Sequence, residues 1–148
     1  MDRELMLKSA FIALQRIEDC SGNAIKEVLR DNYDNEILKE MFIMALDPYT
    51  TYGVKKFSVP TKVKRSDVSL DNYIEFKKLL KLLEKRELTG NAALAKIKKF
   101  FGNCNSVEIK WYSKILQMDL KIGASVKTIN SVYKGLINEF EVMAAEGL

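Results

Sequence analysis

The sequence predicts an all-α domain of about seven to nine helices. Apolar residues recur at steps of three and four along most of the 148-residue chain, which is the spacing of one helical face. Only seven glycines and two prolines are present, too few for the many tight turns of a strand-rich protein. With 47% hydrophobic and 30% charged residues, the composition is that of one folded domain.

The N-terminal part predicts three amphipathic helices, at about 3–19, 23–31 and 35–46. Gly22 separates the first two, and Ser21 can cap the second. The third ends before Pro48, because proline lacks an amide hydrogen and clashes with a preceding helical turn.

A loop is predicted over 49–68, where the pattern is irregular and rich in lysine; we expect it to be ordered and to contain one helical turn. A loop of this length in a compact domain is usually functional or mobile. With this loop in the middle of the chain, the helices can form either a single body or two lobes joined near 47–69.

Further helices are predicted at about 70–86, from the break at Thr89–Asn91 to Phe101, at 106–118 and at 126–134. Ser69 caps the first of them, and Asn105 with Glu108 has the spacing of a capping box. Aromatic residues in this part fall on apolar faces, so we expect them in the core rather than as base-stacking platforms: Tyr73, Phe76, Phe100, Phe101, Trp111 and Tyr112.

Charge is distributed unevenly along the chain. Residues 1–52 carry 6 basic and 10 acidic side chains, a net charge of −4, whereas residues 53–121 carry 16 and 7, a net charge of +9. The remaining residues, 122–148, have a net charge of −1. A basic segment beside an acidic one is typical of a surface that meets a polyanion, although lysines also solvate ordinary helix surfaces.

Several kinds of chemistry are excluded or disfavoured. The chain has no histidine, so the usual catalytic triads are excluded, and it has no glycine-rich phosphate loop of the Gly-x-x-x-x-Gly-Lys-Ser/Thr kind. Cys20 and Cys104 lack zinc-ligand spacing and are expected to be reduced thiols. No apolar run approaches the length of a membrane span, and we expect no membrane partner.

Two glycine junctions are the candidate binding features, Thr89-Gly90-Asn91 and Gly123-Ala124-Ser125. Each is followed by a new helix, whose first amide groups lack partners within the helix and point outward with the positive end of the helix dipole. A phosphate group can accept hydrogen bonds from these amides, and its negative charge is favoured at the positive end of the dipole. Arg86 precedes the first junction, and Lys121 and Lys127 flank the second; ordinary capped helix starts are the alternative interpretation.

These junctions also carry a family resemblance. The segments RELTGNAA (86–93), MDLKIGASVKTINSV (118–132) and GLINEFEVM (135–143) resemble the N-terminal DNA-binding domain of bacteriophage-type ATP-dependent DNA ligases. The resemblance implies one helical domain over 1–148 that binds the minor groove on both sides of a nick, with 135–148 as the start of the link to an adenylation domain. It also implies a monomer in the cytoplasm of a bacterial or phage-infected cell.

The resulting set of expected DNA contacts is Arg86, Thr89, Gly90, Asn91, Lys121, Gly123, Ala124, Ser125, Lys127 and Thr128. The loop adds further candidates: Lys55, Lys56, Lys62, Lys64 and Arg65. No Lys-x-Asp-Gly nucleotide-attachment motif is present, so this chain is not expected to ligate DNA by itself. We expect no cofactor in the chain; ATP and Mg²⁺ would belong to catalytic domains outside it.

The expected partner is double-stranded or nicked DNA, bound without regard to sequence because phosphate contacts carry no base identity. Two other functions remain open. A helical protein-interaction domain would expose an apolar groove and would not bind DNA in a salt-dependent way. A helix-turn-helix regulator would use 119–133 as its motif, with Lys127, Thr128 and Asn130 facing the bases.

Overall fold

The computed structural model describes residues 2–63 and 65–139. Within these ranges the chain forms helices only: α1 (Arg3–Glu18), α2 (Asn23–Asp31), α3 (Glu36–Leu46), α4 (Leu70–Glu84), α5 (Gly90–Phe101), α6 (Ser106–Leu116) and α7 (Val126–Val132). The all-α prediction is therefore confirmed. Lys64 and most of the expected linker, 140–148, lie outside the described residues.

Of the predicted capping residues, Ser69 and the Asn105–Glu108 pair are confirmed, and Asn35 and Ser125 cap two further helices. Asn35, Ser69 and Ser125 each accept a hydrogen bond from an amide in the first turn that follows, and Asn105 forms the predicted capping box with Glu108. The prediction for α2 was wrong, since Gly22 and not Ser21 occupies the capping position. Gly22 has a φ of +61°, and no side chain caps this helix.

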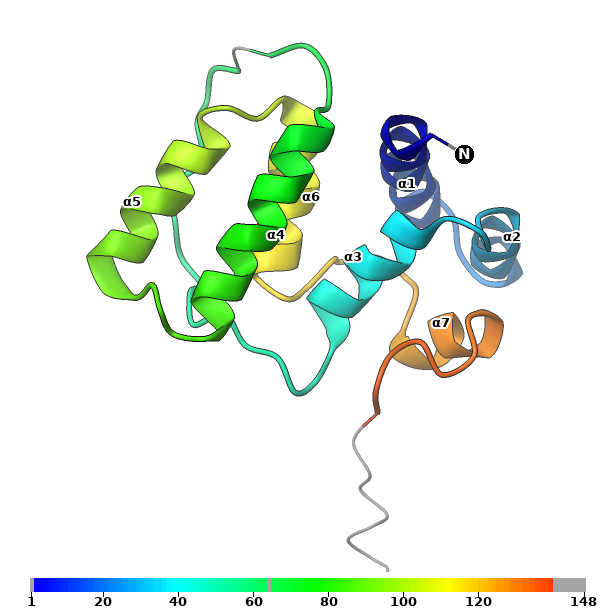
Figure 1. Ribbon diagram of the computed structural model, residues 1–148. Helices are drawn as coiled ribbons and strands as arrows, with labels where there is room; N and C mark the ends of the chain where they lie inside the picture. Colours follow the sequence, from blue (N-terminus) through cyan, green and yellow to red (C-terminus); the bar gives the residue numbers. More distant parts are fainter. Residues whose placement is uncertain (1, 64, 140–148) are drawn as a thin grey trace, which may run out of the picture.

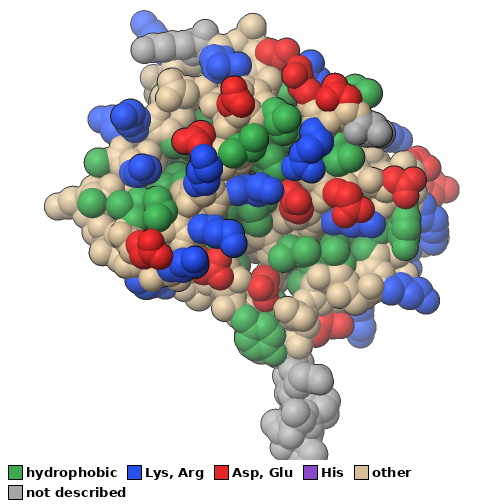
Figure 2. All heavy atoms as spheres, viewed as in Figure 1, with side chains coloured by type: hydrophobic (Ala, Val, Ile, Leu, Met, Phe, Trp, Pro, Cys, Tyr) green, Lys and Arg blue, Asp and Glu red, His purple; other side chains and the backbone are tan. Residues whose placement is uncertain are grey.

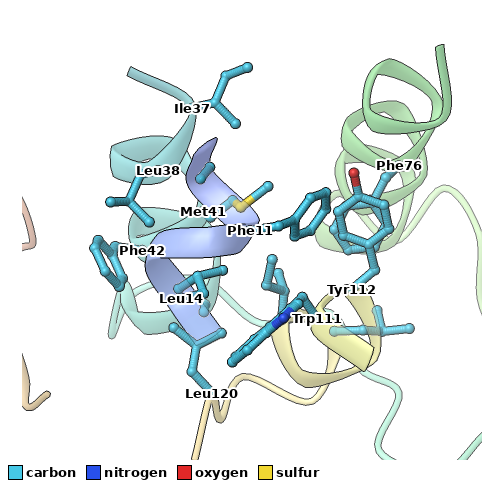
Figure 3. Close-up of a cluster of buried hydrophobic side chains, with 14 of the residues drawn as sticks. Phe11, Leu14, Ile37, Leu38, Met41, Phe42, Phe76, Trp111, Tyr112 and Leu120 are labelled. Atoms are coloured by element: carbon cyan, nitrogen blue, oxygen red, sulfur yellow. The ribbon is translucent and has the colours of Figure 1, made fainter. Parts of the chain in front are cut away.

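The helices form two groups that share one core (Figure 1). Helices α1, α2, α3 and α7 lie on one side, and α4, α5 and α6 on the other. Figure 3 shows side chains of both groups in contact at the centre, with Phe11 of α1 directed toward Tyr112 of α6. These two rings are 5.5 Å apart between centroids. The two predicted lobes are thus joined by a continuous hydrophobic cluster rather than by the 47–69 segment alone.

The 47–69 segment contains no α-helix in its described part. It begins with one hydrogen-bonded turn, in which the Thr50 amide donates to the Asp47 carbonyl oxygen at 3.2 Å, and continues as an extended strap. Its apolar side chains are anchored to helices on both sides of it. Tyr52 is buried and donates to the Met44 carbonyl oxygen at 2.6 Å, while Phe57 stacks on Phe101 at 5.7 Å between ring centroids. This anchoring replaces local helix hydrogen bonds as the source of order in the segment.

Candidate nucleic-acid interface

The start of α5 exposes unpaired backbone amides. Residues 89–92 are all exposed, and Thr89, the capping residue, makes no side-chain hydrogen bond. Within the described residues, the amide groups of Gly90, Asn91 and Ala92 have no acceptor; the first bond is from Ala93 to the Thr89 carbonyl oxygen at 3.2 Å. Gly90 has a φ of +60° and open space around its missing Cβ. The turn is therefore accessible to an anion from solvent.

The second turn is more fully satisfied by its own residues. Ser125 accepts from the Thr128 amide at 3.1 Å, and the two hydroxyl groups lie 3.1 Å apart. Ala124, one of the predicted contacts, is buried, with 7% of its surface exposed, so it offers little surface to a ligand. A Cβ on Gly123 would lie 3.3 Å from Ile25 Cδ1, so glycine permits close packing of this turn on α2.

Two of the predicted cations project from the second turn into solvent. Lys121 and Lys127 are exposed, and neither takes part in an ion pair within the described part of the chain. Lys121 adopts a φ of +52°, and its amide donates to Asp119 Oδ1 at 3.0 Å. The starts of α5 and α7 both lie toward the lower edge of the molecule in Figure 1, at opposite ends of it.

Arg86 is used partly as an anchor for the strap. Its guanidinium group donates to the Leu83 carbonyl oxygen at 3.0 Å and to Thr51 Oγ1 at 2.5 Å. The same group lies against Gly53, where a Cβ would collide with it. Since a guanidinium group has five N–H donors, others are left for solvent or a ligand.

The predicted cations of the strap divide into anchored and exposed residues. Lys55 donates to the Gln117 carbonyl oxygen at 3.2 Å, at the end of α6. Lys62 and Arg65 are exposed near the turn of the strap. Lys56 lines an open cleft of about 490 Å³ with Lys98 of α5, a pairing that sequence analysis missed because the two residues are far apart in the chain.

Surface charge follows the two helix groups. Figure 2 shows Lys and Arg side chains over α4 and α5, and a larger share of Asp and Glu over the opposite half of the same face. This matches the basic character of residues 53–121 and the acidic character of residues 1–52. Basic and acidic side chains predominate on different helix groups, and ion pairs such as Glu18 with Lys110 and Lys114 join the two groups where they meet.

Comparison with known proteins finds similar DNA ligases and similar solved structures. No protein-family model matches the chain. The DNA ligases of Enterobacteria phages T4 and T6 are each 31% identical over 123 residues, which is 80% of this chain and 24% of theirs. Two solved structures, named Pmar-Lig_PreS3 and Pmar-Lig_Pre., have a TM-score of 0.76 and 29% identity, over 84% of this chain and 29% of theirs. The chain thus spans about a quarter of the length of these relatives.

Proposed function

Because this chain is homologous to bacteriophage DNA ligases over 80% of its length, we propose that it is a non-catalytic domain that binds the backbone of double-stranded DNA around a nick. The observation that carries the proposal is the accessible start of α5, where three amide groups without acceptors among the described residues lie within a basic helix group. A duplex phosphate is an anion of the kind that such a turn binds.

The binding mechanism is electrostatic positioning. A phosphate oxygen accepts from the amides of Gly90 and Asn91, where the absence of a Cβ at Gly90 permits a close approach. At the other end of the same edge, Lys121 and Lys127 neutralise further phosphates. Lysine contacts release counterions from the duplex, so affinity depends steeply on salt and not on base sequence.

Contact on both sides of a strand break would hold its two ends in line. In a longer ligase, this grip would keep the nick in place while catalytic domains that bind ATP and Mg²⁺ close on it. We accordingly propose roles in DNA replication, repair and recombination, in the cytoplasm of a bacterial or phage-infected cell.

Side-chain contacts disfavour the helix-turn-helix alternative. Asn130 is held on both sides of its amide, donating to the Ile137 carbonyl oxygen and accepting from the Ile137 amide, each at 2.9 Å. Thr128 is paired with Ser125. Of the three side chains that would read bases, only Lys127 projects without such a contact in the described structure, and one lysine cannot specify a site.

The test is a salt-dependent titration of labelled nicked, intact and sequence-scrambled duplexes. Asn91→Asp places a negative charge at the start of α5, where it repels phosphate but favours the helix dipole. We expect about tenfold weaker binding to every duplex, without loss of thermal stability. Unchanged affinity for all three duplexes would eliminate the α5 turn as a contact.

The same titration tests the cations of the second turn. If about five phosphates are contacted, log K falls with log salt at a slope near −4.5, and the double variant Lys121→Ala, Lys127→Ala reduces the slope by about 2. Lys8→Ala, on α1 and paired with acidic residues, is the matched control and should leave the slope unchanged. A change in sequence preference with overall affinity intact would contradict the backbone-binding proposal.

A further inference from the structure

A groove runs between α4 and α5, and its lining begins at Ala92, beside the exposed start of α5. It has a volume of about 550 Å³. Its lining on α5 runs from Ala92 to Phe100, about 12 Å at 1.5 Å per residue, and Asn103 extends it beyond the end of the helix. An element of three helical turns would fill it.

The floor of the groove is apolar and rigid. Leu79 of α4 and Phe100 of α5 line it, and Phe100 stacks on the buried ring of Phe76 at 5.5 Å between centroids. Ala92 and Ala95 are exposed, and their short side chains keep the wall on the α5 side low. Small and apolar residues at helical spacing form the kind of surface on which another helix packs.

The rim of the groove is positively charged. Lys96 and Lys99 line it from α5, and neither is paired with a carboxylate in the described part of the chain. The one carboxylate in the lining, Glu75, is already paired with Lys78 at 3.3 Å. An occupant with acidic flanks would therefore meet complementary charge along α5.

We propose that this groove docks an acidic amphipathic helix of a partner protein. The apolar face of the helix packs mainly on Ala92, Ala95 and Phe100, above the buried Leu79. Its Asp or Glu side chains lie beside Lys96 and Lys99. Duplex DNA fits this site less well, because a sugar–phosphate backbone gains nothing from an apolar floor. The site thus differs in chemistry from the proposed DNA contacts and adjoins them only at Ala92, whose amide belongs to the exposed start of α5.

The probe is a fluorescein-labelled synthetic helix of about 15 residues, with Leu and Ala on one face and Glu elsewhere. We expect it to bind the full chain, and amide chemical shifts to change at Ala92, Ala95, Lys96 and Lys99. The double variant Lys96→Glu, Lys99→Glu should weaken binding by at least about tenfold. Lys98→Glu, a matched reversal on the other side of the same helix, should change it by less than about twofold.

Competition with unlabelled nicked duplex separates this site from the DNA-binding surface. A duplex that binds and leaves the peptide in place supports a separate docking groove. If the duplex does not bind, peptide binding and its loss in the Lys96→Glu, Lys99→Glu variant test the groove by themselves. A duplex that displaces the peptide and loses affinity in the Lys96→Glu, Lys99→Glu variant would show that the groove is a DNA contact. Shifts confined to other residues, or equal weakening by Lys98→Glu, would also overturn the proposal.

Discussion

A single buried carboxylate, Glu108, joins the starts of two helices. Its side chain is fully buried, and Oε1 accepts from the Asn105 amide at 2.9 Å and from Asn72 Nδ2 at 3.2 Å. Oε2 accepts from the Ser69 amide at 3.0 Å. A buried carboxylate is tolerated only when it is well hydrogen-bonded. Glu108 thus completes the capping box of α6 and also fixes the start of α4 against it.

Tyr112 is also buried, but unlike Glu108 it leaves a polar group without a hydrogen bond in the described structure. Its hydroxyl group has no hydrogen-bond partner among the described residues, although the ring stacks on Phe76 at 4.3 Å between centroids. Burial raises the pKa of this hydroxyl, so it stays protonated. We expect Tyr112→Phe to leave the free energy of unfolding unchanged or to raise it by up to about 1 kcal/mol, measured by urea denaturation.

Tyr73→Phe is the matched control for this prediction. Tyr73 is equally buried, but its hydroxyl donates to Glu40 Oε1 at 2.5 Å. Loss of this hydroxyl should cost about 1–2 kcal/mol, since a hydrogen bond to a charged acceptor is removed, although Glu40 keeps its contact with Lys77 at 3.2 Å. If Tyr112→Phe proved the more costly substitution, Tyr112 would have an acceptor in solution.

At the scale of elements, two helices end without the glycine that usually follows a helix of this kind. Arg86 follows α4 with a φ of +60°, and Met118 follows α6 with a φ of +57°. In each case the next amide reaches back to close the helix, from Glu87 to Leu82 at 2.9 Å and from Asp119 to Lys114 at 3.0 Å. Glycine is the usual residue at this position. Its absence explains why sequence analysis extended both helices by two residues.

The contact between α1 and α6 depends on an ion network around Glu18. Its carboxylate oxygens lie 2.7 Å from Lys110 Nζ and from Lys114 Nζ. Both lysines also lie over the Trp111 ring, 4.9 and 4.5 Å from its centroid. Hydrogen bonds from these lysines lower the pKa of Glu18 from 4.5 to about 2.

This pKa shift predicts a defined loss of stability in acid. Because the folded-state pKa is depressed, the stabilisation is fully present above pH 4.5 and is lost as the pH falls toward about 2. After allowance for solvent screening, we expect about 1 kcal/mol. Chemical denaturation at several pH values should show that Glu18→Gln removes this part of the pH dependence. An identical pH profile in the variant would contradict the assignment.

The contact between Gly53 of the strap and Arg86, which follows α4, predicts that Gly53→Ala lowers the stability of the fold. Gly53 has a φ of +74°, and a Cβ there would collide with the Arg86 guanidinium group. We expect a loss of about 2 kcal/mol, from backbone strain and from displacement of Arg86. Gly22→Ala is the control, because Gly22 has a similar φ of +61° but no atom within 4 Å of a Cβ.

The free energies of unfolding of the two glycine variants, measured by urea denaturation, distinguish the effect of the Cβ–Arg86 collision from the effect of backbone strain. Gly22→Ala should cost about 1 kcal/mol, which is the strain alone. Equal losses would mean that Arg86 moves aside freely and does not anchor the strap.

At the scale of the whole molecule, the fold gives one helix group an acidic excess and the other a basic excess. The acidic residues of 1–52 lie on the group formed mainly by α1, α2 and α3, and the basic residues of 53–121 on the strap and α4–α6. A shared core holds the two groups together, as Figure 3 shows for Phe11, Trp111 and Tyr112. A polyanion therefore meets an oriented surface, which favours one approach to the molecule.

Parts of the candidate site that depend on local sequence were predictable, and parts that depend on long-range contacts were not. Gly90 and Gly123 are exposed turns at helix starts, as expected. The burial of Ala124 and the anchoring by Arg86 and Lys55 depend on contacts with distant residues, for which local patterns carry no signal. The same is true of the groove between α4 and α5, whose walls come from two helices.

The sequence by itself determined where the helices lie, the caps of α4 and α6 and the uneven distribution of charge, because periodicity and caps act over a few residues of backbone. Only the tertiary structure decided that Glu108 serves two helices, that the strap is bound by Phe57 and Arg86, and that two groups share one core. Each of these joins residues far apart in the chain, and such pairs are selected by packing and by the need of buried polar groups for partners.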